Sequence, residues 1–493
     1  MQVVAHGSAR TGCRLARIPG NKFARVLLAV GVLAVTAVRA EAKTLYVDAA
    51  RGNDATSHSA NGPDAPWRTL GRASWGSPNR NSPNTSEAAR AGDTVIVRAG
   101  TYTTTGTGDR FNPAFNPVNS GSAGNQLVFQ AESGVVLTFS SGIGPVIGVA
   151  NQSYVTWKGF VVNESLAPST SDTGPVTLSG TRGSSIEDCT IIGRGNINRM
   201  DNYPGIRIEW ASDLLIRNNR VSNFLGGTNS PAVQLYRAGR VIFEHNEFFN
   251  VGNGIAIKGT AEAEYNDWFI IRNNLMHHID LAGVWIHRAA APPYIRIYQN
   301  VVRDSAAGVI IHNFGDWTEP QHVQVINNTL HANVANIVIQ YDSVAANANH
   351  RFQNNLITGG RTAAIHFSDM TPANITTARY LFARNMYQGN ANLGYGISDV
   401  ASLSSWQSQF GQDQGSTNAN PLYVNAAAFD FRLQAASPAR NAGIDFLDLN
   451  RNGSTTDAIT IGAYITGSEV IGPTTASATN GLPGSPTNLR IVP

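Results

Sequence analysis

GIRIEW, at residues 205–210, is the first of six similar segments that recur through the middle of this chain. The other five are AVQLYR (232–237), GIAIKG (254–259), GVWIHR (283–288), GVIIHN (308–313) and NIVIQY (336–341). A second short apolar segment follows each of them and ends in Asn, at Asn219, Asn246, Asn274, Asn300, Asn328 and Asn355. These asparagines stand 26–28 residues apart. Short β-type segments that repeat at this period predict a stacked solenoid rather than a globular sheet.

Stacking explains how such short repeats bury their apolar side chains. Each repeat is too small to cover its own apolar face, but coils spaced about 4.8 Å apart bury that face against one another. The first predicted column is Ile206, Val233, Ile255, Val284, Val309 and Ile337. The second is Ile216, Phe243, Ile271, Ile297, Val325 and Phe352. A slip of one residue would expose a whole column, so the alternation fixes the register.

The repeat resembles the right-handed parallel β-helix of the pectate-lyase-like superfamily, and the resemblance covers most of the mature chain. It implies an all-β fold, a single-stranded right-handed parallel β-helix with an N-terminal cap. Residues 44–120, which include GDTVIVRAGTY (92–102), resemble the entry segment of secreted carbohydrate-active β-helix proteins. Residues 420–445 resemble the closing segment of the same proteins.

The expected organisation has four parts. Residues 1–42 are expected to be a signal peptide, because VLLAVGVLAVTAV (26–38) follows a basic stretch and is too short to span a membrane. Residues 43–125 are expected to form the cap and first coil, and residues 126–470 the β-helix. Residues 471–493, rich in Pro, Thr, Ser, Ala and Gly, are expected to form a flexible tail. The protein is therefore expected to be secreted or periplasmic, without a membrane span.

Smaller features complete the structural prediction. A short helix is expected near 69–73, and a helical or irregular insertion at 399–412. The chain has two cysteines, one in the expected signal peptide, so Cys189 is expected to be a buried apolar residue rather than half of a disulfide. The asparagine ladder is expected to be structural, since Asn hydrogen-bonds from coil to coil and tolerates left-handed backbone.

Composition narrows the choice of partner. Charged residues make up 14% of the chain and the formal net charge is +3, so no strong attraction to nucleic acid is expected. We expect a monomer that binds an acidic polysaccharide.

One outward-facing row of the first strand carries the candidate chemistry. Down the stack it contains Glu209, Tyr236, Lys258, His287, His312, Gln340 and Ser368. The next position contains Trp210, Arg237, Gly259, Arg288, Asn313, Tyr341 and Asp369. Lys, His, Arg and Tyr are concentrated over a few coils, where a plain solvated face would carry Thr, Ser, Asn and Gln. Both a functional cleft and a solvated face fit this row.

A cationic, aromatic-lined groove suits β-elimination at a uronic acid. A base removes the proton at C5, and this proton becomes acidic only when the neighbouring carboxylate is neutralised by Arg or a divalent cation. Neighbouring positive charges bring a lysine pKa toward neutrality, as a base requires. Polysaccharide lyases of this fold use a Lys or Arg base, so the resemblance implies the same role for Lys258, one coil from Arg288. The candidate catalytic residues are Lys258, Arg288, His287, His312 and Tyr236. The candidate substrate-binding residues are Arg237, Arg207, Trp285 and Glu209, with Arg288 and Arg237 neutralising carboxylate and Trp285 stacking on a sugar.

A calcium ion is a possible cofactor. Glu262, Glu264 and Asp267, in the loop after Lys258, are the candidate ligands, and a solvated acidic loop is the alternative. Asp48, Asn53 and Asp54 offer a second oxygen cluster, which would otherwise close a turn.

Two other function classes remain open. A glycoside hydrolase on this fold needs two carboxylates, for which Glu209, Asp213 and Glu244 are the candidates. A non-catalytic, glycan-binding surface protein needs only exposed aromatic and polar side chains. A uronate epimerase would use similar Tyr, His and Arg chemistry, but the DPHD-type motif of alginate epimerases is absent.

Overall fold

The computed structural model describes residues 41–142, 144–166, 174–196, 202–227, 229–258, 268–287, 294–313, 322–341, 349–396 and 400–474. Residues Ala42–Pro493 belong to one compact unit. The expected signal peptide lies almost entirely outside the described residues, as does most of the expected tail.

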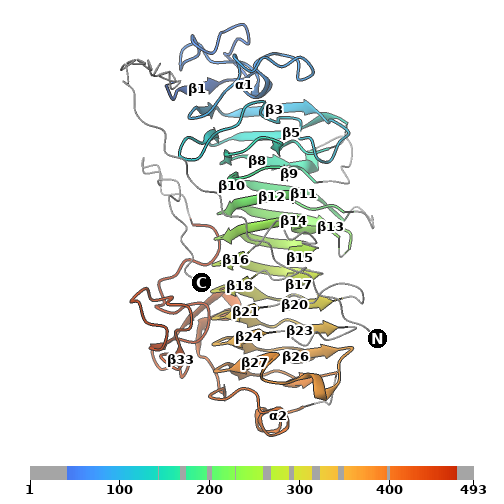
Figure 1. Cartoon of the computed structure of the whole chain (residues 1–493), viewed down its shortest axis with the longest axis vertical. Helices are drawn as coiled ribbons and strands as arrows, with labels where there is room; N and C mark the ends of the chain where they lie inside the picture. The colour runs from blue at the N-terminus through green and yellow to red at the C-terminus, as the bar shows by residue number, and fades with distance from the viewer. Residues whose placement is uncertain are drawn as a thin grey trace, which may run out of the picture. The chain divides into compact units, whose positions relative to one another are not determined.

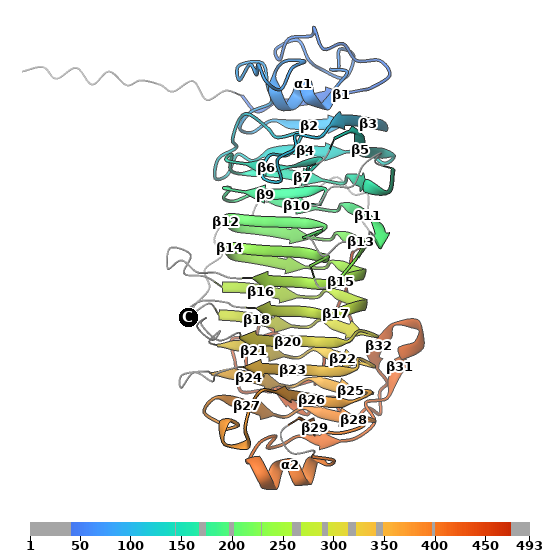
Figure 2. The same cartoon turned by 90° about the vertical axis from the view of Figure 1, so that its right-hand side faces the viewer.

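The described chain is a parallel β-helix whose coils place strands on three walls (Figures 1 and 2). The site wall is the one that carries the candidate residues. It contains β6 (Ile147–Ala150), β9 (Val176–Ser179), the first part of β12 (Ile206–Arg217) and of β14 (Pro231–Glu244), the last part of β15 (Glu247–Lys258) and of β17 (Leu275–His287), β20 (Ala307–Asn313), β23 (Ala335–Tyr341), β26 (Ala363–Ser368) and β29 (Gly394–Tyr395).

The chain turns from the site wall into the second wall. The second wall contains β1 (Thr44–Val47), β2 (Thr94–Val97), β4 (Leu127–Ala131), β7 (Val155–Lys158), β10 (Ser185–Glu187), the last part of β12 and of β14, β16 (Trp268–Arg272), β18 (Tyr294–Tyr298), β21 (Val323–Ile326), β24 (His350–Gln353) and β27 (Tyr380–Ala383). Parallel pairing therefore already begins at β1, ahead of the boundary expected at residue 126.

The third wall closes each coil. It contains β3 (Gly100–Thr105), β5 (Val135–Ser141), β8 (Val161–Asn163), β11 (Thr190–Asn196), β13 (Arg220–Leu225), the first part of β15 and of β17, β19 (Val301–Arg303), β22 (Thr329–His331), β25 (Leu356–Thr358), β28 (Met386–Gln388) and β30 (Thr417–Asn418).

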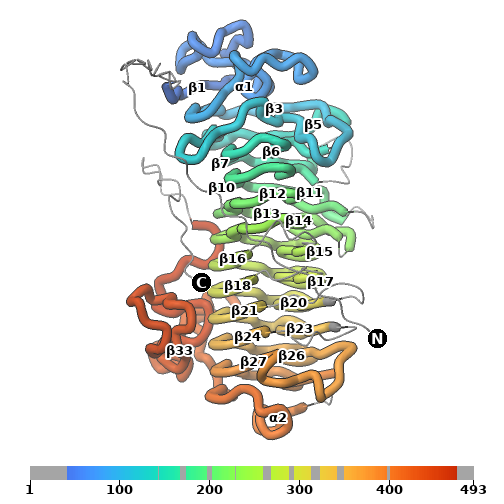
Figure 3. Tube along the Cα trace, in the orientation of Figure 1, coloured from blue at the N-terminus to red at the C-terminus, as the bar shows by residue number. Residues whose placement is uncertain are grey.

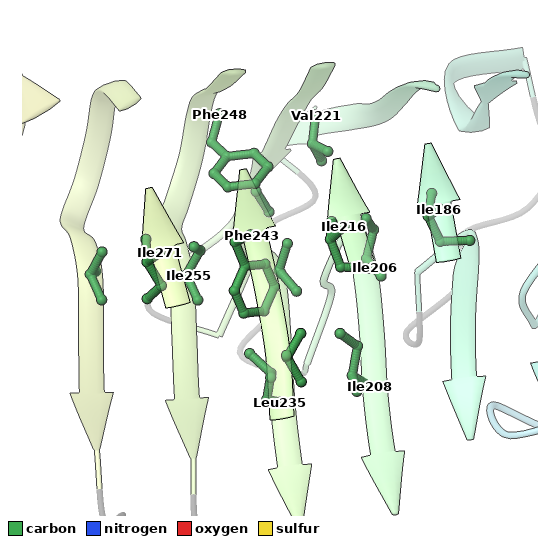
Figure 4. Close-up of a cluster of buried hydrophobic side chains, with 14 of the residues drawn as sticks. Ile186, Ile206, Ile208, Ile216, Val221, Leu235, Phe243, Phe248, Ile255 and Ile271 are labelled. Atoms are coloured by element: carbon green, nitrogen blue, oxygen red, sulfur yellow. The ribbon is translucent and has the colours of Figure 1, made fainter. Parts of the chain in front are cut away.

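Both predicted apolar columns are confirmed. Ile206 pairs with Val233, and the same register continues through Val284 to Ile337 on the site wall. The column that begins at Ile216 runs in register along the second wall to Phe352. All of these side chains are buried, and Figure 4 shows part of both columns facing one another inside the coils. Because one face of every strand must fill this interior, the other face points outward.

The asparagine ladder is buried and continuous. The backbone N–H and the side-chain Nδ2 of Asn246 both donate to Oδ1 of Asn274, at 3.0 and 2.9 Å. Equivalent bonds join successive coils from Asn219 to Asn385, where Nδ2 of Asn385 donates to Asp413. One part of the expectation was wrong. The left-handed backbone belongs to the residue before each ladder asparagine, with φ of 59° at Asn218 and 56° at His245. The backbone N–H of the ladder asparagine itself donates along the helix axis to the asparagine of the next coil.

Both expected segments contain a helix. α1 (Leu70–Trp75) begins after Thr69, whose hydroxyl accepts from the N–H of Arg72, and ends at Gly76 with φ of 69°. α2 (Leu403–Phe410) is capped in the same way by Ser402 and Gly411. Within the described ranges, short 3-10 helices cover Glu164–Leu166, Pro372–Asn374 and Ala426–Ala428. Cys189 is buried in the core, as expected.

The segment after β30 leaves the coil path. The β-helix was expected to continue to residue 470, but after β30 the chain forms two antiparallel pairs outside the large sheet. One pair is β31 (Tyr423–Asn425) with β32 (Asp430–Leu433), and the other is β33 (Gly443–Ile444) with β34 (Ala458–Ile459). In Figure 3 this orange-to-red segment runs back beside β24, β21 and β18. Apolar clusters pack it on the second and third walls, and the hydroxyl of Thr474 donates to Asn218 at 3.0 Å.

Candidate functional site

The predicted outward row exists on the site wall. The register pairs Glu209 with Tyr236, Lys258 with His287, and His287 with His312. Leu235 pairs with Ile257, which places Tyr236 and Lys258 on adjacent coils. The row then continues from His312 through Gln340 to Ser368. Residues far apart in the sequence are thus neighbours on one wall, about 4.8 Å apart.

Lys258 is held in place at the end of β15. Its side chain is 8% exposed, and its Nζ donates to Oδ1 of Asn229. The same nitrogen lies 5.1 Å from the centre of the Trp285 ring, on the next coil. An ammonium group over an aromatic face is attracted by the ring quadrupole. Asn229 and Trp285 therefore both fix the position of the amine.

Two histidines and a tryptophan form a ring cluster beside this amine. The ring centres of Trp285 and His287 lie 4.6 Å apart, and those of His287 and His312 lie 5.1 Å apart. His312 is 6% exposed and His287 is half-buried. Trp285 packs with Ala256 and Ile310 in an apolar cluster on this outward face. The cluster combines proton-carrying groups with an aromatic surface, which suits catalysis on a sugar.

Glu209 and Tyr236 form the N-terminal part of the row, and Arg207 lies beside them in a parallel outward row two residues earlier along the strand. Nε of Arg207 donates to Oε1 of Glu209 at 2.7 Å, and both side chains are about 95% buried. The Arg207 guanidinium lies 5.4 Å from the centre of the Tyr236 ring. Burial raises the pKa of Tyr236, and the positive charge of Arg207 partly opposes that rise. The structure therefore brings these three predicted residues together.

Arg237 lies at the edge of this group rather than in the row. Its φ is 48°, so the strand bends at this residue, and its exposed side chain lies 5.8 Å from the ring centre of Trp210.

Some predicted site residues lie outside the described residues, namely Arg288, Glu262, Glu264 and Asp267. The structure therefore places neither the predicted carboxylate-neutralising partner of Lys258 nor the predicted calcium ligands.

The second oxygen cluster is used within its own turn. Oδ1 of Asp48 accepts from the N–H groups of Ala50 and Arg51, both at 3.0 Å. Asp54 accepts from Thr69, and Asn53 from Ala55. Among the described residues no group of three His, Cys, Asp or Glu side chains could hold a metal ion.

Arginines bind the carboxylates that a hydrolase would need. Besides the pairing of Glu209 with Arg207, Asp213 accepts from Arg240 at 2.6 Å, and Glu244 accepts from Arg272 at 2.6 Å. Glu244 also lies on the second wall, away from Glu209. These three carboxylates therefore do not form a facing pair.

Sequence reasoning missed several residues that contact the row. Asn202 and Asn229 each stand four residues before a member of the first buried column, Ile206 and Val233, a spacing that could have indicated their equivalence. Oδ1 of Asn202 accepts from Gln234 at 3.0 Å. Arg110 and Phe111 reach the same area from a distant loop, and no repeat spacing marks them.

Comparisons with known proteins agree with the fold. Residues 138–268 match the family model described as right handed beta helix region. No curated protein matches the chain. Among the described residues, no helix is long and apolar enough to cross a membrane.

Several solved structures are similar to this chain at low identity. A complex of XylC with xylose is 12% identical, with a TM-score of 0.46, covering 77% of this chain and 87% of that one. The pectate lyase Pel9A is 16% identical, with a TM-score of 0.43, covering 86% and 97%. The A-module of the mannuronan C-5 epimerase AlgE6 from Azotobacter vinelandii is 12% identical, with a TM-score of 0.44, covering 67% and 91%.

Proposed function

We propose that this right-handed parallel β-helix is a secreted polysaccharide lyase that cleaves a uronate-containing polysaccharide by β-elimination. The observation that carries the proposal is the uninterrupted row Tyr236, Lys258, His287 and His312 on one outward face. Such a row places a candidate base and candidate acids within one or two coils of each other.

The reaction assigns one step to each group. The neutral amine of Lys258 takes the proton from C5 of the uronate. The electron pair left behind forms the C4–C5 double bond, while the bond between C4 and the glycosidic oxygen breaks. His287, His312 or Tyr236 then gives a proton to the departing oxygen. The products are an unsaturated uronate end and a new hydroxyl end.

Charge neutralisation makes the first step possible. The C5 proton is weakly acidic until the adjacent carboxylate is bound by a cation. Arg237, at the edge of the row, and Arg288 are the candidates for this cation. A calcium ion held by Glu262, Glu264 and Asp267 would supply the same neutralisation.

A panel of uronate polymers tests the proposal. The purified protein is incubated with polygalacturonate, alginate and glycosaminoglycans, with and without chelator, and the ultraviolet absorbance of unsaturated product is followed. A lyase raises this absorbance on at least one polymer. New reducing ends without absorbance would indicate a hydrolase, and neither signal would indicate a binding protein. Loss of the signal with chelator would assign the neutralising role to a metal ion.

A further inference from the structure

We propose that the outward face of the site wall is closed at its N-terminal side, so that the protein binds one end of an acidic polysaccharide chain and holds a terminal uronate carboxylate on Arg207. This inference rests on the proposed function for its ligand class. It adds the mode of attack, which is release of short products from a chain end.

A loop from an earlier coil crosses the outward face. The hydroxyl of Thr177, in β9, donates to the backbone carbonyl of Arg110 at 3.0 Å. Thr177 pairs in register with Arg207, and its neighbours Val176 and Leu178 belong to the core, so its side chain points outward. Thr177 is nevertheless 0% exposed. The loop around Arg110 therefore lies on the row that continues through Arg207.

The loop is held in shape by its own hydrogen bonds. The hydroxyl of Thr107 donates to the carbonyl of Asn112 at 2.7 Å, and Oδ1 of Asp109 accepts from the N–H of Phe111 at 2.9 Å. The ring of Phe111 lies 5.3 Å from that of Trp210 and 5.8 Å from the Arg207 guanidinium. Beyond β12, a sugar chain that follows the row meets this loop and must stop.

Two buried polar atoms beside the loop find no hydrogen-bond partner in the part of the chain that the structure describes. These are Nη1 of Arg207, a donor, and Oε1 of Gln234, an acceptor. The two residues pair in register and are 4% and 0% exposed. Buried polar groups without partners are rare, so each needs a physical explanation. A uronate satisfies both, because its carboxylate accepts from Nη1 and a ring hydroxyl donates to Oε1.

Local charge also favours an acidic sugar. Glu209 occupies Nε and Nη2 of Arg207, which leaves Nη1 for the ligand. The exposed Arg110 and Arg237 add two further positive charges near the same place. The half-buried ring of Phe111 must swing aside for a carboxylate to reach Nη1.

The distance to the candidate base sets the product size. Arg207 pairs with Gln234, and Gln234 with Ala256, two residues before Lys258. The two sites are therefore separated by two coil spacings, about 10 Å, and by two residues along the strand, about 7 Å, which makes about 12 Å in all. Only a short oligosaccharide fits between a terminal carboxylate on Arg207 and a bond cleaved at Lys258.

Product size tests the inference. Polygalacturonate and alginate chains are digested, and products are sized by mass spectrometry while viscosity is recorded. We expect short unsaturated oligosaccharides from the first time points and a slow fall in viscosity. In the double variant Arg110→Gly with Phe111→Gly, longer mixed products are expected as the face opens. Long mixed fragments from the unaltered protein would overturn the inference.

Binding provides a test independent of cleavage. The Lys258→Ala variant is mixed with short and long fractions of the same polymer, and the amount of bound protein is measured. This amount is expected to scale with the number of chain ends rather than with the mass of polymer. Arg207→Gln is expected to weaken binding about tenfold or more, whereas Arg220→Gln on the third wall is the matched control. Thermal unfolding verifies that each variant is folded. A further variant, Phe111→Ala, changes the surface over Arg207 without altering the buried arginine itself.

The two ideas can fail separately. Unsaturated product of mixed sizes with binding that scales with mass would overturn chain-end recognition and leave the lyase. Binding that scales with chain ends without unsaturated product would overturn the lyase and leave chain-end recognition. Absence of binding to both polymers would overturn both.

Discussion

The amine of Lys258 lies 5.1 Å from the centre of the Trp285 ring, although the two residues belong to successive coils. The contact exists because Ala256 pairs with Trp285 and Lys258 with His287 in one register. The small Ala256 leaves room for the neighbouring indole, over which the lysine extends. One strand alignment thus joins a candidate base to an aromatic surface.

Replacing Lys258 by Ala tests the role of the base. We expect loss of unsaturated product and an unchanged fold, because the side chain lies on the outward face rather than in the core. Product formation is measured by ultraviolet absorbance and folding by circular dichroism. Lys158→Ala is the matched control, since Lys158 lies on the second wall beside Asp188. Full activity of Lys258→Ala would exclude it as the base.

Replacing Trp285 by Ala tests the aromatic surface. The loss of stacking on the sugar, worth about 1 kcal/mol for an aromatic contact, predicts a roughly fivefold weaker interaction with substrate. We expect KM to rise more than kcat falls, and Trp285→Phe to recover much of the loss. Equal kinetics for Trp285→Ala and the unaltered protein would contradict a stacking role.

Replacing Glu164 by Gln tests a buried carboxyl in the core. Burial raises the pKa of Glu164 to about 7, while a hydrogen bond from the Tyr203 hydroxyl at 2.8 Å partly opposes the rise. The folded state therefore favours the protonated form. This contribution to stability is fully present below the unfolded pKa, near 4.5, and is lost as the pH rises through about 7.

Glu164→Gln should remove that pH dependence. At pH 8 the variant is expected to be more stable than the unaltered protein by roughly 1–3 kcal/mol, whereas at pH 4 the two should be alike. Denaturant unfolding across this range measures the difference. The exposed Glu132 provides the control, because Glu132→Gln should leave the pH dependence in place. A constant offset between Glu164→Gln and the unaltered protein at every pH would contradict the assignment.

Replacing Asn274 by Ala tests the asparagine ladder. The side chain accepts from Asn246 and donates to the carbonyl of Phe243 at 3.0 Å and to Asn300 at 2.9 Å, all in the interior. Its loss leaves buried partners unsatisfied, so we expect destabilisation by about 2–4 kcal/mol, measured by denaturant unfolding. Asn418→Ala, at an exposed position in β30, should change stability by less than about 0.5 kcal/mol. Similar losses for both variants would contradict the axial role of the ladder.

The periodic part of the molecule was predictable from local pattern. Ile255 and Val284 were expected in one column because an alternating strand can bury only one of its faces, and their pairing is observed. The same reasoning placed Lys258 beside His287. Once the coil length and the buried face are known, the outward neighbours follow without further information.

Non-periodic contacts were not predictable in this way. The loop carrying Phe111 reaches Trp210 across about a hundred residues, and no repeat relates the two positions. The chain after β30 was expected to form a last coil. Its apolar residues, such as Leu447 and Leu449, instead cover the outside of the second wall, where Ile242 and Ile270 would otherwise be exposed.

The sequence by itself determined the coil, its register and the row of Tyr236, Lys258, His287 and His312, because burying one strand face leaves a single alignment. Only the tertiary structure decided which atoms surround that row. Asn229 accepts a hydrogen bond from Lys258, and Glu209 accepts one from Arg207. The loop around Arg110 covers Thr177. The contact of the Arg110 loop joins segments whose separation follows no period, and the other two contacts depend on how neighbouring side chains pack.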